Sequence, residues 1–241
     1  MANIKFMVCP HDTVRNPDGW YRLVQFLTSH YELSLHFEMS LDFSEFREAM
    51  MNADLVYANP TDAINLIDQH GMKPLMRPAD TYDEALIVTG PDGDLPDVSA
   101  INGAMVASVE NLLPTRIGLK CMEGKGIKPA GILHRDSWLS VVRSVWNGEA
   151  PFGIVYRDAY EELSQQGRDM VRILGETEER SAFHMFVARP VLHQDLATLL
   201  PSLTEMHNDP DGASILKEIS IPAWAIVSDD ALAKMRALVN G

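Results

Sequence analysis

The sequence predicts an α/β protein with two lobes, in which mixed sheets are flanked by helices. Short apolar runs alternate with longer segments whose apolar residues recur at helical spacing, and this alternation is typical of sheets covered by helices. A turn-rich stretch, GPDGDLPD at 90–97, interrupts the alternation, which then starts again. We therefore expect one lobe to be inserted into the other, with lobe I at 1–88 and 189–241 and lobe II at 89–188.

The first series opens with a buried strand, IKFMVC at 4–9. Residues 20–31 carry apolar side chains at helical spacing, which predicts an amphipathic helix. Residues 31–39 alternate between apolar and polar, and this pattern predicts a strand with one face in solvent. The chain therefore begins as strand, helix and strand.

The series continues with a helix over 42–52 and a strand over 54–59. Asn59 is a natural N-cap, Pro60 suits the first position of a helix, and Gly71 suits the position just past its end. These signals predict a third helix that starts directly at the end of a strand.

The second series repeats the pattern after two extended segments at 73–78 and 82–90. Strands are expected at 104–109, 130–134, 152–156, 169–174 and 183–188. Helices are expected over 112–124 and 136–147, and from about 191 onward the chain is expected to be mostly helical. In such sheets, ligands bind at the carboxyl ends of strands and between domains.

Composition narrows the classes of partner. The chain has 241 residues, with 34 acidic and 20 basic side chains, so nucleic acid and anionic membranes are poor partners. It shows neither an apolar run long enough for a membrane span nor the pattern of an export signal, which favours a cytoplasmic protein, or a periplasmic one if a leader or receptor context was removed. Cys9 and Cys121 have no metal-type spacing, so we expect no metal and no cofactor.

Five stretches carry a resemblance to a known family. They are DLVYANP (54–60), RPADTY (77–82), ASVENLLPTRIG (107–118), NGEAPFGIVYRDAY (147–160) and NDPDG (208–212). In order and spacing they resemble the phosphate, phosphite and phosphonate substrate-binding proteins of the type 2 periplasmic-binding fold, over nearly the whole chain. The resemblance implies a clamshell related to ABC transporters that closes on a small ligand without catalysis.

The resemblance also implies which residues contact the ligand. They are Asn59, Thr61, Tyr82, Asn111, Thr115, Arg116, His134, Ser137, Tyr156 and Asp158. Most lie at a strand end or a helix start, where backbone N–H groups can hold an anion. Each also has a structural interpretation, such as helix capping for Asn59 and Asp158 or a solvated helix face for Arg116.

One of the five stretches departs from the family pattern. Members that bind phosphonates look like D-P-x-S-T-S-G at the second-lobe helix start, whereas this sequence offers the single hydroxyl of Thr115 beside Arg116, and Pro114 donates no backbone proton. The contacts to an oxyanion should therefore come from Thr115, Arg116 and donors brought from elsewhere, such as His134 and Tyr82.

The main hypothesis is a solute-binding or sensor protein that closes on a small oxyanion, phosphonate-like or carboxylate ligand. A protein partner would then recognise the closed conformation. The alternative is a cytoplasmic enzyme of the same fold acting on a small carboxylate, with Asp62, His11 and His134 as the available acid and base groups. Cys9 and His11 could form a nucleophile only if their side chains touch and a third group orients the base. A third possibility is a lobe pair used only for protein contacts.

Overall fold

The computed structural model describes residues 3–241 and divides into two compact units. Unit 1 comprises Met1–Thr81 and Phe183–Gly241, and unit 2 comprises Tyr82–Ala182. Across residues 3–241, none of the helices has both the length and the apolar character needed to cross a membrane. The chain thus contains one unit inserted into another, and each is described by itself.

The boundaries between the units differ from the expected ones by several residues. Strand β6 (Ala85–Thr89), expected at the end of lobe I, pairs with β9 (Phe152–Tyr156) in the sheet of unit 2. Strand β11 (Met185–Ala188), expected in lobe II, pairs with β3 (Leu55–Ala58) in the sheet of unit 1. Both strands are buried along their whole length, so their sequence does not indicate which sheet they join.

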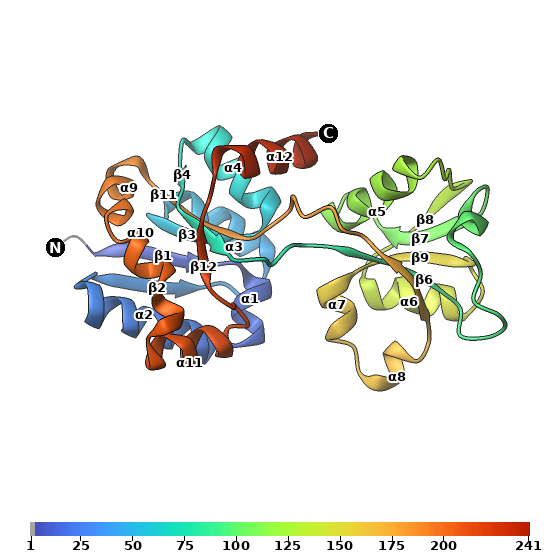
Figure 1. Ribbon diagram of the computed structural model, residues 1–241, viewed down its shortest axis with the longest axis horizontal. Coiled ribbons are helices and arrows are strands. Elements are labelled where there is room, and N and C mark those ends of the chain that lie inside the picture. The colour runs from blue at the N-terminus through green and yellow to red at the C-terminus, as the bar shows by residue number, and fades with distance from the viewer. Residues whose placement is uncertain (1–2) are drawn as a thin grey trace. The chain divides into compact units, whose positions relative to one another are not determined.

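The sheet of unit 1 has the strand order β2-β1-β3-β11-β4 (Figure 1). Its other strands are β1 (Ile4–Val8), β2 (Leu35–Met39) and β4 (Lys73–Pro74). Strand β1 runs parallel to β2 and β3, and β11 runs antiparallel to β3. The strand expected from 31 begins only at Leu35, because Tyr31 still belongs to a helix that ends with Glu32 in the left-handed region at φ 53°.

Helices cover the sheet of unit 1. They are α1 (Pro10–Arg15), α2 (Pro17–Tyr31), α3 (Phe43–Ala49), α4 (Pro60–His70), α9 (Pro190–Ala197), α10 (Leu200–Thr204), α11 (Pro210–Glu218) and α12 (Asp229–Asn240). The core on one face contains Phe6, Trp20, Phe186 and Trp224, all nearly inaccessible to solvent. Trp224 belongs to a short strand, β12 (Trp224–Ile226), which interrupts the tail expected to be mostly helical and pairs with β5 (Met76–Pro78).

The sheet of unit 2 has the strand order β10-β6-β9-β7-β8 (Figure 1). Its remaining strands are β7 (Met105–Val109), β8 (Gly131–Arg135) and β10 (Arg172–Glu176). Strand β7 is parallel to β8 and β9, whereas β6 is antiparallel to β9. The sheet is therefore mixed, as expected.

Both faces of this second sheet are buried. The helices of unit 2 are α5 (Leu113–Gly124), α6 (Trp138–Trp146), α7 (Arg157–Glu161) and α8 (Gln165–Arg168). Alternate strand residues face two separate cores: Ile154 packs with Met122 of α5, and Val155 lies in the core that includes Val142 of α6. Burial on both faces explains why these strands read as continuous apolar runs.

The topology places many of the predicted site residues at two sheet edges, one in each unit. In unit 1 the edge comprises the carboxyl ends of β1 and β3 and the start of β11. In unit 2 it comprises the carboxyl ends of β7, β8 and β9 and the start of β6. Because parallel strands end at the same edge, residues distant in sequence meet there.

Candidate functional site

Helix α5 starts at the unit 2 edge without a polar cap. Strand β7 ends at Val109, and Asn111 then takes the left-handed conformation, with φ at 59°, that turns the chain toward the helix. The cap position itself is occupied by Leu112, whose side chain has no hydrogen-bond acceptor. Asn111 is exposed and lies before this cap position, so it marks the helix start without capping it.

Thr115 lies inside unit 2 and not on its surface. The side chain is 5% exposed, and its hydroxyl donates to the Val109 carbonyl at 2.6 Å. The Ser108 hydroxyl lies 2.7 Å from that of Thr115 and donates to the Ile154 carbonyl at 3.1 Å. The Thr115 hydroxyl therefore links α5 to β7, and its contact with Ser108 extends this link to β9. Arg116, one residue later, is exposed.

Two exposed polar residues lie near the end of β8, one inside the strand and one just after it. His134 pairs with Ser108 of β7 and is exposed, and Ser137 caps α6 by accepting a hydrogen bond from the Ser140 N–H at 3.2 Å. Arg135, between them, is half-buried, and its Nε donates to the Ser144 hydroxyl at 2.6 Å. His134 and Ser137 thus remain accessible at the same edge as Arg116.

The end of β9 joins the start of β6 through side chains. The Tyr156 hydroxyl donates to Asp83 Oδ1 at 3.1 Å, and Arg157 Nη2 donates to the Tyr82 carbonyl at 2.7 Å. Asp158 follows in the first turn of α7, with its carboxylate 3.8 Å from Arg157 Nε. Tyr82, which we expected in lobe I, therefore belongs to unit 2, and its carbonyl contacts Arg157, the residue between Tyr156 and Asp158.

At the unit 1 edge, Asn59 caps α4 as expected. Its Oδ1 accepts from the Asp62 N–H at 3.0 Å, and its Nδ2 donates to Asp62 Oδ2 at 2.6 Å. The buried Asp62 carboxylate also accepts from Arg47 Nε at 2.9 Å. The positive end of this helix already holds a carboxylate, so it is less suited to a free anion, although Thr61 beside it is exposed.

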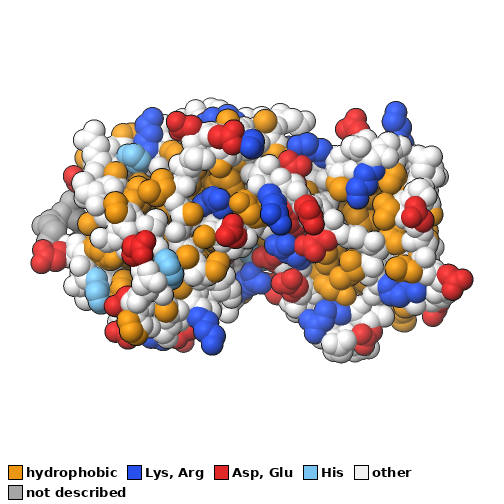
Figure 2. All heavy atoms as spheres, viewed as in Figure 1, with side chains coloured by type: hydrophobic (Ala, Val, Ile, Leu, Met, Phe, Trp, Pro, Cys, Tyr) orange, Lys and Arg blue, Asp and Glu red, His pale blue; other side chains and the backbone are white. Residues whose placement is uncertain are grey.

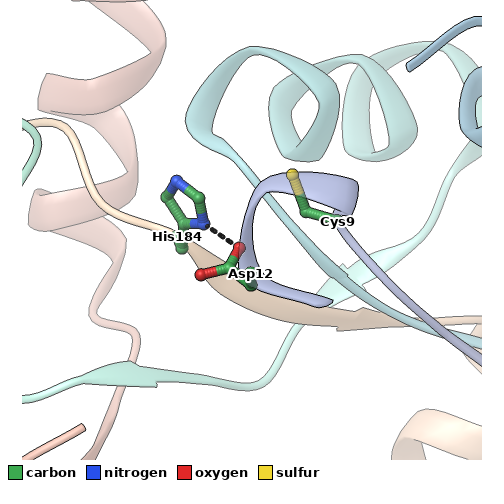
Figure 3. A group of neighbouring side chains, drawn as sticks. All are labelled: Cys9, Asp12 and His184. Carbon is green, nitrogen blue, oxygen red and sulfur yellow. Dashed lines mark hydrogen bonds and ion pairs between the residues drawn. The ribbon is translucent and has the colours of Figure 1, made fainter. Parts of the chain in front are cut away.

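A second group of side chains shares the unit 1 edge (Figure 3). Cys9 follows β1, Asp12 lies in α1, and His184 immediately precedes β11, with His184 Nδ1 2.9 Å from Asp12 Oδ2. Sequence reasoning singled out Cys9 and His11 but not Asp12 or His184, which are 172 residues apart. Thr13 is buried, and its hydroxyl donates to the Cys9 carbonyl at 2.8 Å.

Electrostatics at this edge argue against a nucleophilic cysteine. Burial, together with the nearby Asp12 carboxylate, raises the pKa of the Cys9 thiol well above its usual range. Burial by itself would also raise the pKa of Asp12, but the neighbouring His184 imidazole outweighs this effect and lowers it. Cys9 Sγ is 3.8 Å from Asn59 Nδ2, which is no general base. A protonated buried thiol is a poor nucleophile.

The charges of the molecule are dispersed. Figure 2 shows acidic and basic side chains interspersed with apolar ones over the face in view. The excess of acidic residues therefore does not form one block on this face.

Comparison with known proteins identifies the family. The family model described as "ABC transporter, phosphonate, periplasmic substrate-binding protein" matches residues 6–232. None of the curated proteins shows significant sequence similarity to the chain.

Solved structures show the same fold at low sequence identity. The methylphosphonate complex of PhnD1 from Prochlorococcus marinus has a TM-score of 0.69 and 10% identity, covering 98% of this chain and 97% of that chain. A Xanthomonas citri protein bound to chloride ion has a TM-score of 0.69 and 15% identity, and the match covers 98% of this chain and 97% of that chain. The aliphatic sulphonate binding protein SsuA from Escherichia coli has a TM-score of 0.67 and 14% identity, and the match covers 100% of this chain and 86% of that chain.

These findings confirm the predicted family and its two-lobe type 2 periplasmic-binding fold. They do not support the cytoplasmic expectation, and they fit its stated alternative of a periplasmic protein, because the family is periplasmic. They favour solute binding over the enzyme alternative, because the family and these structural neighbours are substrate-binding proteins. The chain belongs to the family of periplasmic substrate-binding proteins of phosphonate ABC transporters.

Proposed function

We propose that this protein binds a small phosphonate- or sulfonate-like anion and that the unit 2 edge supplies the main contacts to it. The observation that supports this proposal is that three exposed polar side chains belong to elements that meet at this edge: Arg116 in the first turn of α5, His134 in β8 and Ser137 at the cap of α6. A guanidinium suits a tetrahedral oxyanion because its fork of N–H groups can donate two parallel hydrogen bonds.

The carboxylate of Asp158 provides a way to tell the two anion classes apart. A phosphonate that keeps one proton can donate its hydroxyl to Asp158, whereas a sulfonate has no such proton and meets only charge repulsion. We therefore infer that a carboxylate at this edge favours a phosphonate. Replacing Asp158 by Asn should weaken methylphosphonate binding and leave sulfonate binding equal or tighter.

A thermal-shift screen followed by titration calorimetry tests the proposal. The probes are methylphosphonate, an aliphatic sulfonate and inorganic phosphate, with chloride as the reference anion. A ligand at about 100 times its Kd stabilises the folded state by about 2.7 kcal/mol, which corresponds to a Tm increase of about 5–10 °C for a chain of this size. Absence of a shift with all three probes at millimolar concentration contradicts the proposal.

A matched pair of variants tests the role of the edge. Arg116→Ala should lower the affinity for the bound anion at least about tenfold, since it removes a charge-assisted hydrogen bond. Arg143→Ala removes the same charge from an exposed position near the end of α6 and should leave affinity unchanged. Equal losses of anion affinity in the two variants would mean that the net charge of the protein, and not the position of Arg116, determines the affinity.

We further propose that the protein works in the periplasm with an ABC permease as its protein partner, because its family is periplasmic and belongs to ABC transporters. Release of the native protein from cells by osmotic shock would support this location, and its retention in spheroplasts would contradict it.

Recovery of a chemically altered probe after incubation with the protein would instead favour the enzyme alternative. Asn59 and Thr61 stay predictions as additional ligand contacts.

A further inference from the structure

Three potential metal ligands of different chemistry meet at the unit 1 edge. Cys9, Asp12 and His184 each offer one ligand atom, and these atoms all lie within 4.8 Å of one another. Figure 3 shows that two of the side chains come from the start of α1, where Cys9 is the cap residue and Asp12 lies in the first turn, and that the third, His184, comes from the residue before β11. The sheet brings them together, because β1 and β11 are both neighbours of β3.

The distances are close to those of a metal site. Zinc bonds sulfur at about 2.3 Å and nitrogen or oxygen at about 2.0–2.2 Å, so ligand atoms of a tetrahedral site are about 3.3–3.8 Å apart. His184 Nδ1 and Asp12 Oδ2, now 2.9 Å apart, would separate by less than about 1 Å around an ion. A thiol already within 4.8 Å of both needs a comparably small shift.

We propose that Cys9, Asp12 and His184 form a binding site for a thiophilic divalent cation, for which Zn²⁺ is the best match. Thiolate, imidazole and carboxylate are the three ligand types that zinc takes in proteins. One thiolate and one carboxylate balance the two charges of the ion. The thiol proton passes to solvent as the sulfur–metal bond forms, so no oxidant or reductant is required.

Neighbouring side chains support the ligands. Asn59 Nδ2 lies 3.8 Å from Cys9 Sγ and can donate to a metal-bound thiolate. The His11 ring centroid is 6.3 Å from that of His184, which places a second imidazole beside the site as a candidate fourth ligand. The Tyr57 ring, with its centroid 5.8 Å from that of His184, packs against the imidazole and limits its rotation.

Cobalt spectroscopy on the full chain tests the proposal. Co²⁺ added to the purified protein should bind with one-to-one stoichiometry and give a sulfur-to-cobalt charge-transfer band in the near ultraviolet, together with the visible bands of a four-coordinate ion. Zn²⁺ should displace Co²⁺ and abolish both. Asp12→Asn and His184→Gln should each weaken Zn²⁺ binding by at least about tenfold, and Cys9→Ser by at least about 100-fold.

The second cysteine provides a control that does not depend on how the Cys9 variant folds. The chain has two cysteines, so Cys121→Ser leaves Cys9 as its one thiol. An unchanged charge-transfer band in this variant assigns the thiolate ligand to Cys9. Loss of the band in Cys121→Ser would overturn the proposal.

Thermal unfolding adds a readout independent of cobalt. Zn²⁺ should raise the Tm of the wild type and of Cys121→Ser, and this increase should be much smaller in Asp12→Asn. Absence of a charge-transfer band in the wild type, or Zn²⁺ binding unaffected by Asp12→Asn and His184→Gln, would show that these residues form only a structural hydrogen bond. Binding of methylphosphonate is measured separately and does not decide this question.

Discussion

At the scale of single residues, Thr115 shows how burial changes the role of a candidate ligand. Sequence reasoning treated its hydroxyl as an oxyanion donor, whereas the structure places it 2.6 Å from the Val109 carbonyl in the interior of unit 2. The isolated hydroxyl in ASVENLLPTRIG therefore connects a strand to the following helix. The adjacent Arg116 is exposed and remains the stronger candidate at this helix start.

We expect Thr115→Val to lower the free energy of unfolding by about 1–3 kcal/mol, because the buried Ser108 hydroxyl and Val109 carbonyl each lose a partner. Ligand affinity should change little. Thr115→Ser keeps the hydroxyl and should retain most of the stability. Urea unfolding and calorimetric titration measure the two effects, and a large loss of affinity at unchanged stability would restore the role in ligand binding.

At the scale of secondary-structure elements, the packing of α5 on the sheet depends on a glycine. A Cβ added at Gly118 would lie 2.7 Å from Ile154 Cγ2, and Ile154 is fully buried in the middle of β9. Helix and strand therefore approach more closely than a side chain at this position allows. Gly124, in the last turn of the same helix, has open space around it.

Two alanine substitutions in α5 test this packing. Gly118→Ala gains about 1 kcal/mol of helix propensity but costs about 1–3 kcal/mol in overpacking, so we expect a net loss of stability of up to about 2 kcal/mol. Gly124→Ala gains propensity without a clash and should be neutral or stabilising. Urea unfolding of both variants provides the comparison, and equal effects would contradict the close approach.

Caps were the elements' most predictable feature. Asn59 at the start of α4 and Gly71 after its end, where φ is 66°, act as their residue types predict. Ser137, which we expected as a ligand contact, caps α6. Helix α5 differs, because Leu112 stands at its cap position and makes no side-chain cap hydrogen bond.

At the scale of the whole molecule, a buried carboxylate fastens the two chain segments that enter and leave unit 2. Glu84, 3% exposed, accepts hydrogen bonds from the Thr177 hydroxyl, from the Glu179 N–H at 3.1 Å and from the Arg180 N–H at 2.8 Å. Its own carbonyl accepts from the Arg157 N–H at 3.0 Å. Glu84 thus links the segment that enters unit 2 to the segment that leaves it.

We expect Glu84→Gln to destabilise the protein by about 1.5–3 kcal/mol, because the amide NH₂ faces donors that need an acceptor. The segment around the exposed Arg180 should then become more sensitive to trypsin. Glu178→Gln, at an exposed position in the same segment, is the matched control. Equal trypsin sensitivity of the two variants would contradict this role for Glu84.

The sequence by itself determined the alternation of strands and helices and the inserted second unit, because apolar periodicity and turn residues act over short stretches of chain. The family was indicated separately, by the resemblance that five motif stretches carry. Only the tertiary structure decided that β6 and β11 join the sheets opposite to those expected, and that Thr115 is buried. It also brought Asp12 and His184 together. Strand pairing and contacts between residues far apart in the chain depend on the relative positions of whole elements, which local sequence patterns do not contain.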